Sequence, residues 1–223
     1  MTETEIQQFL SLFPEDLMKL TPEAQKVSLV LYRLLIKGKS VSYADVASLS
    51  GLSVQEINRI IGQWGSEVLM DKDNNIIGFF GLSLNKTPHE LQVDNVTLYT
   101  WCAWDTLFIP GLIDKAVTVR SACPVTRQEI KLKISPAGVL SVDPQATVVS
   151  LIIPDARGIA KNVIGTFCCY IHFFSSPKAG NSWVQQNPGT YIVSLNHAFH
   201  LGKRKNEARY PDVTEQPFPG QLR

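Results

Sequence analysis

The sequence predicts an α+β protein in which a helical N-terminal domain precedes a mixed, strand-rich core. The first third of the chain has capped segments with helical spacing of apolar residues, whereas the rest has short segments with strand-like alternation. One core segment is apolar on nearly all sides and predicts a buried helix. We therefore expect a winged-helix-like domain of three helices at 1–84, a core at 85–209 and a loosely held tail at 210–223.

The first predicted helix begins at Thr21 and Pro22, because Thr is a good N-cap and Pro suits the first helical position. A wide apolar stripe follows and ends near Gly38. A second, shorter helix is expected at 41–49, and Gly51 then breaks the chain.

A third helix is expected from Ser53 to about Trp64. Ser53 and Glu56 have the spacing of a capping box, in which each side chain bonds the other residue's backbone amide. Two short apolar segments within 68–80 flank a polar turn at 71–75 and predict a hairpin. Three helices followed by a hairpin are the outline of a winged helix.

A winged helix suggests DNA binding, but the charges of this one argue against it. Its third helix, where a recognition helix would lie, has Arg59 as its single basic residue, against Glu56. The whole chain has a net charge of only +1, and binding to phosphates needs several Lys or Arg side chains. We interpret the domain as a packing module and predict no nucleic-acid partner.

The core is expected to combine one buried helix with several strands. The buried helix is predicted from Leu98 to Ile109, with Pro110 ending it. A short helix is expected at 196–202. Strands are predicted at 117–120, 129–134, 148–153, 166–174 and 191–195.

The composition predicts a globular cytoplasmic protein with no membrane partner. Hydrophobic residues make up 44% of the 223 residues, but no apolar run is long enough to cross a bilayer. The acidic N-terminus lacks the basic start of a signal peptide. In the cytoplasm thiols stay reduced, so we do not expect the four cysteines to form two disulfides.

Cys102 and Asp105 are the first candidate functional pair. They lie three residues apart, which places them on one face of the predicted helix. Trp101 and Trp104 flank them, and burial beside indole rings should raise the pKa of the carboxyl group. Either residue alone would be read as packing, but together they favour a soft-metal ligand beside a proton donor.

Cys168 and Cys169 are adjacent and cannot both face one site on a strand, because successive side chains alternate. Cys168 shares its expected face with Tyr170 and His172, whereas Cys169 shares a wholly apolar face. Cys168 is therefore the predicted reactive thiol, and Cys169 the predicted packing residue.

Other motifs give little support for chemistry. Nothing near Cys123 in the sequence activates it, so we expect a structural role. The four histidines form no metal-binding signature, and nucleotide-binding or serine-hydrolase motifs are absent from the sequence.

At its cysteines the chain resembles the organomercurial lyases, also called alkylmercury lyases or MerB. The segment 71–78 also resembles this family, and the similarity extends from about residue 20 to about 205. The two segments that carry it are Trp101-Cys102-Ala103-Trp104-Asp105-Thr106-Leu107 and Phe167-Cys168-Cys169-Tyr170-Ile171-His172-Phe173-Phe174.

The resemblance implies a catalytic trio of Cys102, Asp105 and Cys168, which also hold mercury transiently. It implies that Cys123 is structural and Cys169 accessory. The expected reaction is protonolysis of R–Hg⁺ to a hydrocarbon and Hg(II), which passes to mercuric reductase. No permanent cofactor is expected, although an external thiol should be needed to remove Hg(II).

Two alternatives remain at this point. The first is a winged-helix regulator that senses soft metals, which would need the basic DNA-binding face that is missing here. The second is a non-catalytic mercury or copper carrier, which would bind metal through the same thiols and release no hydrocarbon.

Overall fold

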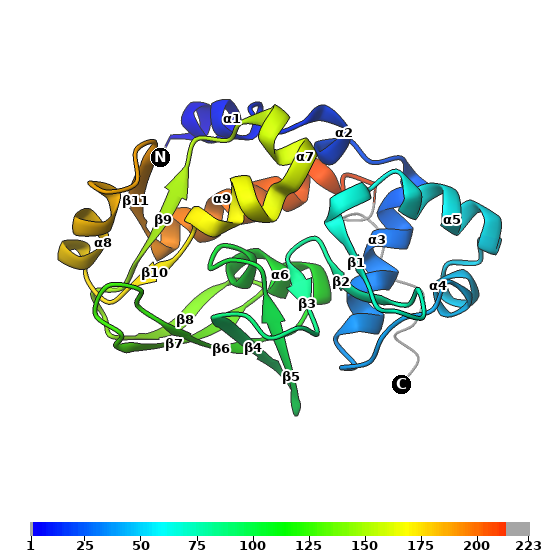
Figure 1. Ribbon diagram of the computed structural model, residues 1–223, viewed down its shortest axis with the longest axis horizontal. Coiled ribbons are helices and arrows are strands. Elements are labelled where there is room, and N and C mark those ends of the chain that lie inside the picture. Colours follow the sequence, from blue (N-terminus) through cyan, green and yellow to red (C-terminus); the bar gives the residue numbers. More distant parts are fainter. Residues whose placement is uncertain (1, 213–223) are drawn as a thin grey trace.

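The computed structural model describes residues 2–212, which form two antiparallel sheets, with helices above the larger sheet and its lower face left open in the view of Figure 1. Within this range the larger sheet has eight strands in the order β1-β2-β3-β5-β4-β6-β7-β8, and the smaller has three in the order β10-β9-β11. The α+β class predicted from the sequence is therefore confirmed.

The elements have the following bounds. The larger sheet contains β1 (Val68–Met70), β2 (Ile76–Phe79), β3 (Leu82–Ser83), β4 (His89–Val93), β5 (Val96–Thr100), β6 (Val117–Ala122), β7 (Glu129–Ser135) and β8 (Gly138–Asp143). The smaller sheet contains β9 (Val148–Ile152), β10 (Phe173–Phe174) and β11 (Thr190–Ser194). The helices are α1 (Glu3–Leu10), α2 (Glu15–Met18), α3 (Pro22–Leu35), α4 (Tyr43–Ser50), α5 (Val54–Gly62), α6 (Asp105–Ile113), α7 (Ala156–Thr166), α8 (Pro177–Val184) and α9 (Leu195–Arg209), with 3₁₀ turns η1 (Gly65–Glu67) and η2 (Cys168–Tyr170).

The helices α3 and α5 begin at the capping residues identified in the sequence, and α4 ends at the glycine identified there. The Thr21 hydroxyl accepts a hydrogen bond from the Ala24 amide, and Ser53 and Glu56 form the expected capping box. Gly51 ends α4 with a φ of 71°, a conformation that glycine adopts without steric cost. Two further helices, α1 and α2, precede this group and were not predicted.

The predicted hairpin is also present, but it is not a free wing. Its strands β1 and β2 are antiparallel, and β2 continues the larger sheet by pairing with β3, which pairs with β5. The sequence-based boundary after residue 84 therefore falls between β3 and β4, inside one continuous sheet.

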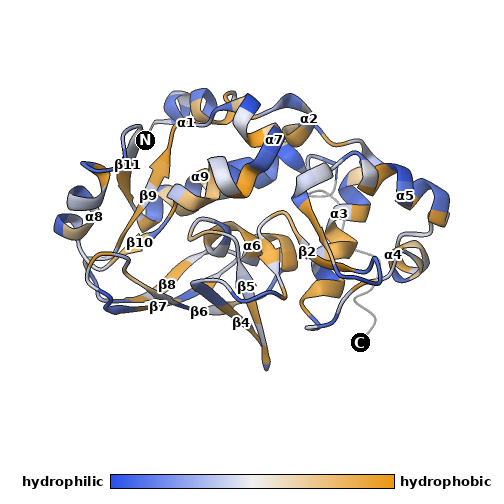
Figure 2. Ribbon diagram, viewed as in Figure 1, coloured by the Kyte–Doolittle hydropathy of each residue, from blue (hydrophilic) through white to orange (hydrophobic). Residues whose placement is uncertain are grey.

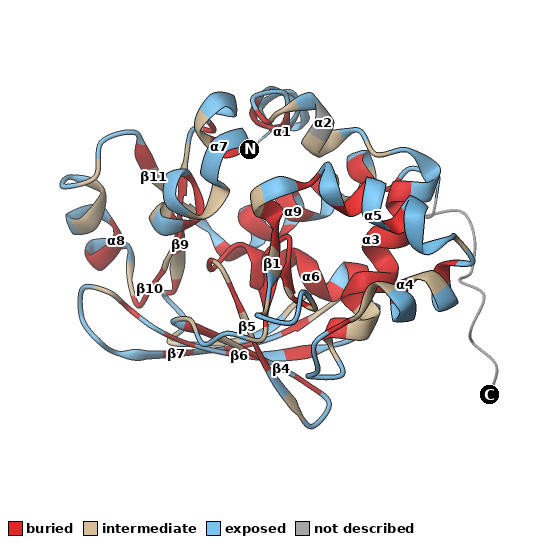
Figure 3. Cartoon of the chain, turned by 45° about the vertical axis from the view of Figure 1, so that its right-hand side comes forward, coloured by how far each residue is buried: buried red, intermediate tan, exposed pale blue. Residues whose placement is uncertain are grey.

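The predicted helix from Leu98 to Ile109 was wrong at both ends. Residues Val96–Thr100 form β5, which lies between β3 and β4, and the helix α6 spans Asp105–Ile113 with Pro110 inside it. Threonine, valine and tyrosine favour a paired strand in β5, and the lost backbone bond at Pro110 is tolerated in a helix that is almost wholly buried. Figures 2 and 3 show α6 as an apolar, buried helix against the larger sheet.

The predicted strand at 166–174 was also wrong. Helix α7 ends at Thr166, a 3₁₀ turn spans Cys168–Tyr170, and only Phe173–Phe174 pair as a strand. The Ile171 amide donates to the Cys168 carbonyl at 3.1 Å, which turns the chain where an extended strand was expected. A short apolar run does not distinguish a buried turn from a buried strand.

Helix α9 is much longer than the predicted 196–202. It runs through the middle of the molecule and packs along α6 (Figure 1). Beyond it, Tyr210 is buried and its hydroxyl lies 2.7 Å from that of Ser28. The rest of the predicted tail, 213–223, lies outside the described residues.

The helices of residues 2–212 are each too short or too polar to cross a lipid bilayer.

Candidate active site

Three chain segments bring Cys102, Asp105 and Cys168 together. Cys102 lies in the turn after β5, Asp105 is the first residue of α6, and Cys168 begins the η2 turn. One ligand atom from each residue lies within 4.8 Å of the other two. All three side chains are buried, with exposed fractions of 1%, 6% and 4%, respectively.

The local backbone fixes the carboxyl group of Asp105. The Cys102 amide donates a hydrogen bond of 2.8 Å to Oδ2 of Asp105. Gly81, at a φ of 95°, passes so close that a Cβ there would overlap the Asp105 carboxyl group. The Gly81 carbonyl in turn accepts a hydrogen bond from the Trp101 amide, which ties this loop to the turn that contains Cys102.

Burial makes Asp105 a proton carrier near neutral pH. Desolvation raises its pKa to about 6, although hydrogen bonds from Cys102 and the charge of Lys205 act in the opposite direction. The sequence-based expectation of a raised pKa is confirmed in direction, and burial is its cause.

The two thiols are also shifted towards their protonated forms. Burial, together with the interactions with Cys168 and Asp105, raises the pKa of Cys102 well above its usual range. The hydrogen bond with Cys102 lowers the pKa of Cys168, but burial and the charge of Asp105 outweigh it and raise the pKa. Both thiols therefore hold their protons until a ligand replaces them.

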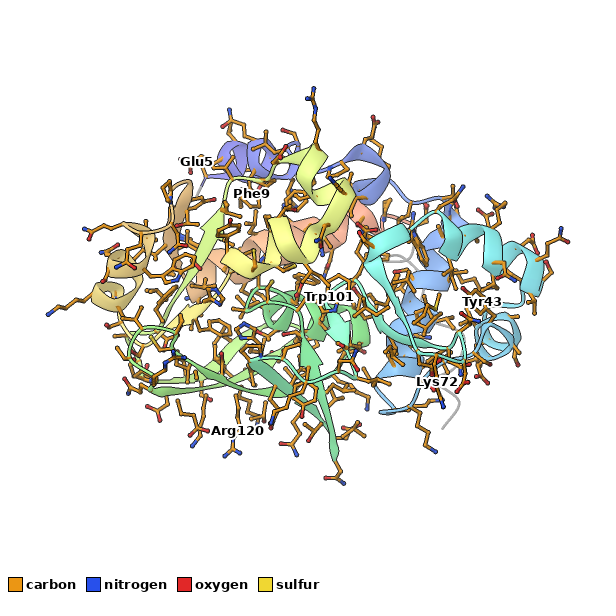
Figure 4. The ribbon with its side chains drawn as sticks, in the orientation of Figure 1. Glu5, Phe9, Tyr43, Lys72, Trp101 and Arg120 are labelled. Atoms are coloured by element: carbon orange, nitrogen blue, oxygen red, sulfur yellow. The ribbon has the colours of Figure 1, made fainter. Side chains whose placement is uncertain are left out.

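A small cavity of about 40 Å³ lies against Asp105 and Cys168. Half of the residues that line it are aromatic, namely Phe13, Phe80, Trp101, Trp104, Phe108 and Phe167. Figure 4 shows Trp101 towards the centre of the molecule, whereas Arg120 lies at its periphery. A second cavity, of about 460 Å³, shares Leu17 and Phe80 with the small one and is lined by none of the three clustered residues.

The sequence around these residues is similar to that of known proteins. Residues 82–206 match the family model of alkylmercury lyase, and this range includes all three clustered residues. The chain is 42% identical to an alkylmercury lyase of Pseudomonas putida over 173 residues, or 77% of this chain and 79% of that protein. It is 38% identical to an alkylmercury lyase of Bacillus cereus, over 78% of this chain and 77% of that protein.

The chain belongs to the alkylmercury lyase family. The fold agrees with this assignment, since the structure superposes on the crystal structure of the mercury-bound form of MerB2 with a TM-score of 0.76. That comparison covers 92% of this chain and 99% of the other, at 22% sequence identity.

The other two cysteines of this alkylmercury lyase, Cys169 and Cys123, lie outside the cluster of Cys102, Asp105 and Cys168. Cys169 is exposed, and its thiol donates to the Gly165 carbonyl at 3.0 Å. Cys168 is thus the buried thiol and Cys169 the exposed one, the reverse of the packing role expected for Cys169.

Cys123 is fully buried, and its thiol is hydrogen-bonded by two residues that follow it closely in the sequence and by one that does not. Burial raises the pKa of its thiol, but hydrogen bonds from Thr126, Ser175 and Val125 outweigh burial and lower it to about 7. The expectation that nothing activates Cys123 was therefore wrong, although this thiol remains closed to solvent.

Lys205 of α9 is the site residue that the sequence analysis missed. It is 6% exposed and lines the small cavity with Asp105 and Cys168. Burial and the charge of Arg209 lower its pKa to about 7, against the opposite effect of Asp105 and the two thiols. Its spacing from the buried Ala198 and Leu201 follows a helical face, so extending the short predicted helix would have found it.

Proposed function

We propose that this chain cleaves the carbon–mercury bond of R–Hg⁺ by protonolysis, with Cys102, Asp105 and Cys168 as the reacting groups. One observation carries the proposal: two buried thiols and a buried carboxyl group of raised pKa lie within 4.8 Å of one another, and Asp105 and Cys168 of this group line a small cavity. Thiolates are the protein ligands that a soft ion such as mercury prefers.

The proposed reaction conserves charge and protons. R–Hg⁺ and two thiols give R–H, Hg(II) held by two thiolates, and one proton released to solvent. The first thiolate binds the mercury, and the second raises its electron density and weakens the carbon–mercury bond. Asp105 takes a proton from one thiol and delivers it to the leaving carbon, so the electron pair of the carbon–mercury bond becomes the new carbon–hydrogen bond.

The hydrogen bond from the Cys102 amide supports this role for Asp105. It leaves Oδ1 for the transferred proton and holds the carboxyl group beside both thiols. A pKa of about 6 lets the group both accept and donate a proton near neutral pH.

We propose that the reaction uses no permanent metal or organic cofactor. Hg(II) held by two thiolates needs an external thiol to leave, and mercuric reductase is the acceptor that we propose. All four cysteines are free thiols, which suits the cytoplasmic location that we propose.

We further propose that the N-terminal helices and the hairpin form a winged-helix-like packing module. Its place at the edge of the larger sheet supports a role in holding Phe80 and Gly81 against the site. A regulator would need basic side chains on α5, which has Arg59 alone.

The test is methane release from methylmercury in heavy water with excess thiol. We expect methane that carries one deuterium, because the protons of thiols and carboxyls exchange with solvent before transfer. A carrier would bind methylmercury without methane, and that result would refute the lyase proposal. Protein with all four thiols blocked by alkylation is the control for spontaneous cleavage.

A further inference from the structure

Lys205 is a buried cation that the proposed reaction does not yet use. It extends from α9 into the small cavity that Asp105 and Cys168 also line. Its ammonium nitrogen lies 3.4 Å from the ring centroid of Phe108 and 5.6 Å from that of Trp104. Within the described residues no carboxylate oxygen lies within ion-pair distance of this nitrogen, and the two rings are the aromatic groups that it faces.

Such a placement costs stability unless something compensates it. A buried ammonium loses its hydration, and interaction with two aromatic faces restores only part of that free energy. Its charge does interact with Asp105, Cys102 and Cys168. The lysine therefore lies where negative charge would be stabilised if the reaction creates it there.

The reaction moves a negative charge onto the mercury at this place, because Asp105 is neutralised when it takes the proton of the second thiol. R–Hg bound to one thiolate is neutral, but R–Hg bound to two thiolates is an anion, and it forms before the carbon receives its proton. In a cavity lined by aromatic rings, little solvent screens that charge. In its protonated form Lys205 is a cation held at this position, and it lowers the energy of the anion without having to reorganise.

We propose that Lys205 is a positioning residue whose positive charge stabilises the anionic adduct of R–Hg with the Cys102 and Cys168 thiolates. This inference rests on the proposed lyase function. Two anchors of α9 and α6 keep the charge in place. The indole nitrogen of Trp104 donates to the Ala198 carbonyl at 2.9 Å, and the amide nitrogen of Asn206 donates to the Phe108 carbonyl at 2.9 Å.

Loss of the Lys205 charge should affect kcat and KM differently. The first thiolate makes a neutral adduct, so loss of the cation should leave KM for methylmercury nearly unchanged. The second thiolate makes the anion, so kcat should fall. If Lys205 only filled space, replacing it with a side chain of similar length would change neither kcat nor KM.

The experiment compares Lys205→Met, Lys205→Gln and Lys205→Arg in the methane assay, with Lys203→Met as the matched control. Lys203 belongs to the same helix, but its side chain is 57% exposed and pairs with Glu207. Methionine keeps the packing of the lysine stem, glutamine keeps a polar end, and arginine keeps the charge. Circular dichroism checks the fold of each variant, and Lys205→Met should melt no lower than wild type because it removes a buried unpaired charge.

We expect kcat of Lys205→Met and Lys205→Gln to fall by at least about tenfold, with KM within about threefold of wild type. Lys205→Arg should keep at least about a third of the wild-type kcat, and Lys203→Met should match wild type. Two results would overturn the inference: wild-type kcat in the folded neutral variants, or a loss in Lys205→Arg equal to that in Lys205→Met. If Lys205→Met does not fold, Lys205→Gln decides. Absence of methane from the wild type itself would instead refute the lyase proposal.

Discussion

The Asp105 side chain is buried and is also able to exchange a proton with its neighbours. It is 6% exposed, yet it lies within reach of two thiols and a lysine. Its environment does not simply neutralise it, because the Cys102 amide and the charge of Lys205 favour the ionised form while burial favours the protonated form. The result is a pKa of about 6, which suits a group that must take up and release a proton in one turnover.

Asp105→Asn should still bind methylmercury but release little methane. Both thiols remain, whereas an amide has no proton to transfer near neutral pH. Loss of general acid catalysis typically costs a factor of about 10²–10⁴, so hydrocarbon release should fall by at least that range. Mass spectrometry of the protein and headspace methane are the two measurements.

The matched control is Asp114→Asn at the other end of α6. Asp114 is exposed and has a φ of 52°, a conformation that asparagine also adopts readily. It should keep wild-type methane release. Wild-type release from Asp105→Asn would show that the proton reaches the carbon from another group.

Asp105→Asn should also stabilise the fold above pH 6. The pKa of Asp105 rises from 3.8 to about 6 on folding, so its contribution to stability is complete below pH 3.8 and is lost as pH rises through 6. Asparagine does not ionise, and its advantage should therefore grow between these values and level off at about 3 kcal/mol or less. Urea unfolding of both proteins at pH 4 and pH 8 measures this, and an equal difference at the two pH values would contradict it.

The cysteines should divide into reacting and non-reacting thiols. Cys102→Ser and Cys168→Ser should each abolish methane release, because one thiolate alone binds R–Hg⁺ without weakening its bond enough. Cys169→Ser should keep substantial activity, since the Cys169 thiol is exposed and donates to Gly165. Steady-state methane release by the three variants is compared, and an inactive, folded Cys169→Ser with an active Cys168→Ser would reverse the assignment.

Cys123→Ser should affect stability more than chemistry. Cys123 is fully buried and accepts a hydrogen bond from the Thr126 amide at 3.5 Å. Serine is smaller and more polar, and a buried polar substitution of this kind costs about 1–3 kcal/mol. Thermal unfolding should show the loss, while kcat of the folded variant should stay near wild type; an unchanged melting temperature with a large loss of kcat would contradict this role.

At the scale of elements, the close contact between α6 and α9 positions the site. Gly202 of α9 approaches α6 so closely that a Cβ there would lie 2.7 Å from the Cβ of Phe108. Gly202→Ala should therefore destabilise the protein by about 1–3 kcal/mol and lower turnover by moving Lys205. Gly62→Ala in α5 is the control, because a Cβ at Gly62 meets nothing within 4 Å.

Denaturant unfolding and methane release are measured on both glycine variants. Gly62→Ala should be neutral or stabilising by up to about 1 kcal/mol, since alanine is the better helix former. Equal stability of the two variants would show that α6 and α9 can separate without cost.

Local sequence signals predicted the elements that end at clear caps and missed those that depend on tertiary contacts. Thr21, Gly51 and Ser53 act within one turn of the chain, so the bounds of α3, α4 and α5 could be read from them. The strand β5 pairs with β4 across a short turn and with β3, and the turn at Cys168 is stabilised by a hydrogen bond from the Ser150 hydroxyl to the Tyr170 carbonyl. An apolar pattern cannot report those partners.

The candidate site was predicted better than the backbone that holds it. Cys102, Asp105 and Cys168 were identified from residue chemistry and family resemblance, and they do converge. The reasons given were partly wrong, because Cys102 lies before α6 and Cys168 in a turn, so neither a shared helical face nor strand alternation brings them together. Lys205 was not predicted because the end of α9 is rich in charged residues, so no apolar pattern marks the buried face of this helix.

At the scale of the whole molecule, the even balance of charges excludes a strong attraction to polyanions. The chain has 21 basic and 20 acidic residues, and α5 has Arg59 as its basic residue beside Glu56. We expect no sequence-dependent binding of duplex DNA in a fluorescence anisotropy titration at physiological salt. Nanomolar binding that depends on sequence would revive a regulatory role for the N-terminal helices.

The hydrogen bond from the Cys102 amide to Asp105 makes that amide a spectroscopic reporter of the reaction. Its ¹⁵N and ¹H resonances should shift as the carboxyl group titrates, with a midpoint near the pKa of about 6. They should shift again when mercury displaces the thiol protons. One amide signal, in the unmodified protein, thus allows the resting, loaded and product states of the site to be distinguished during turnover.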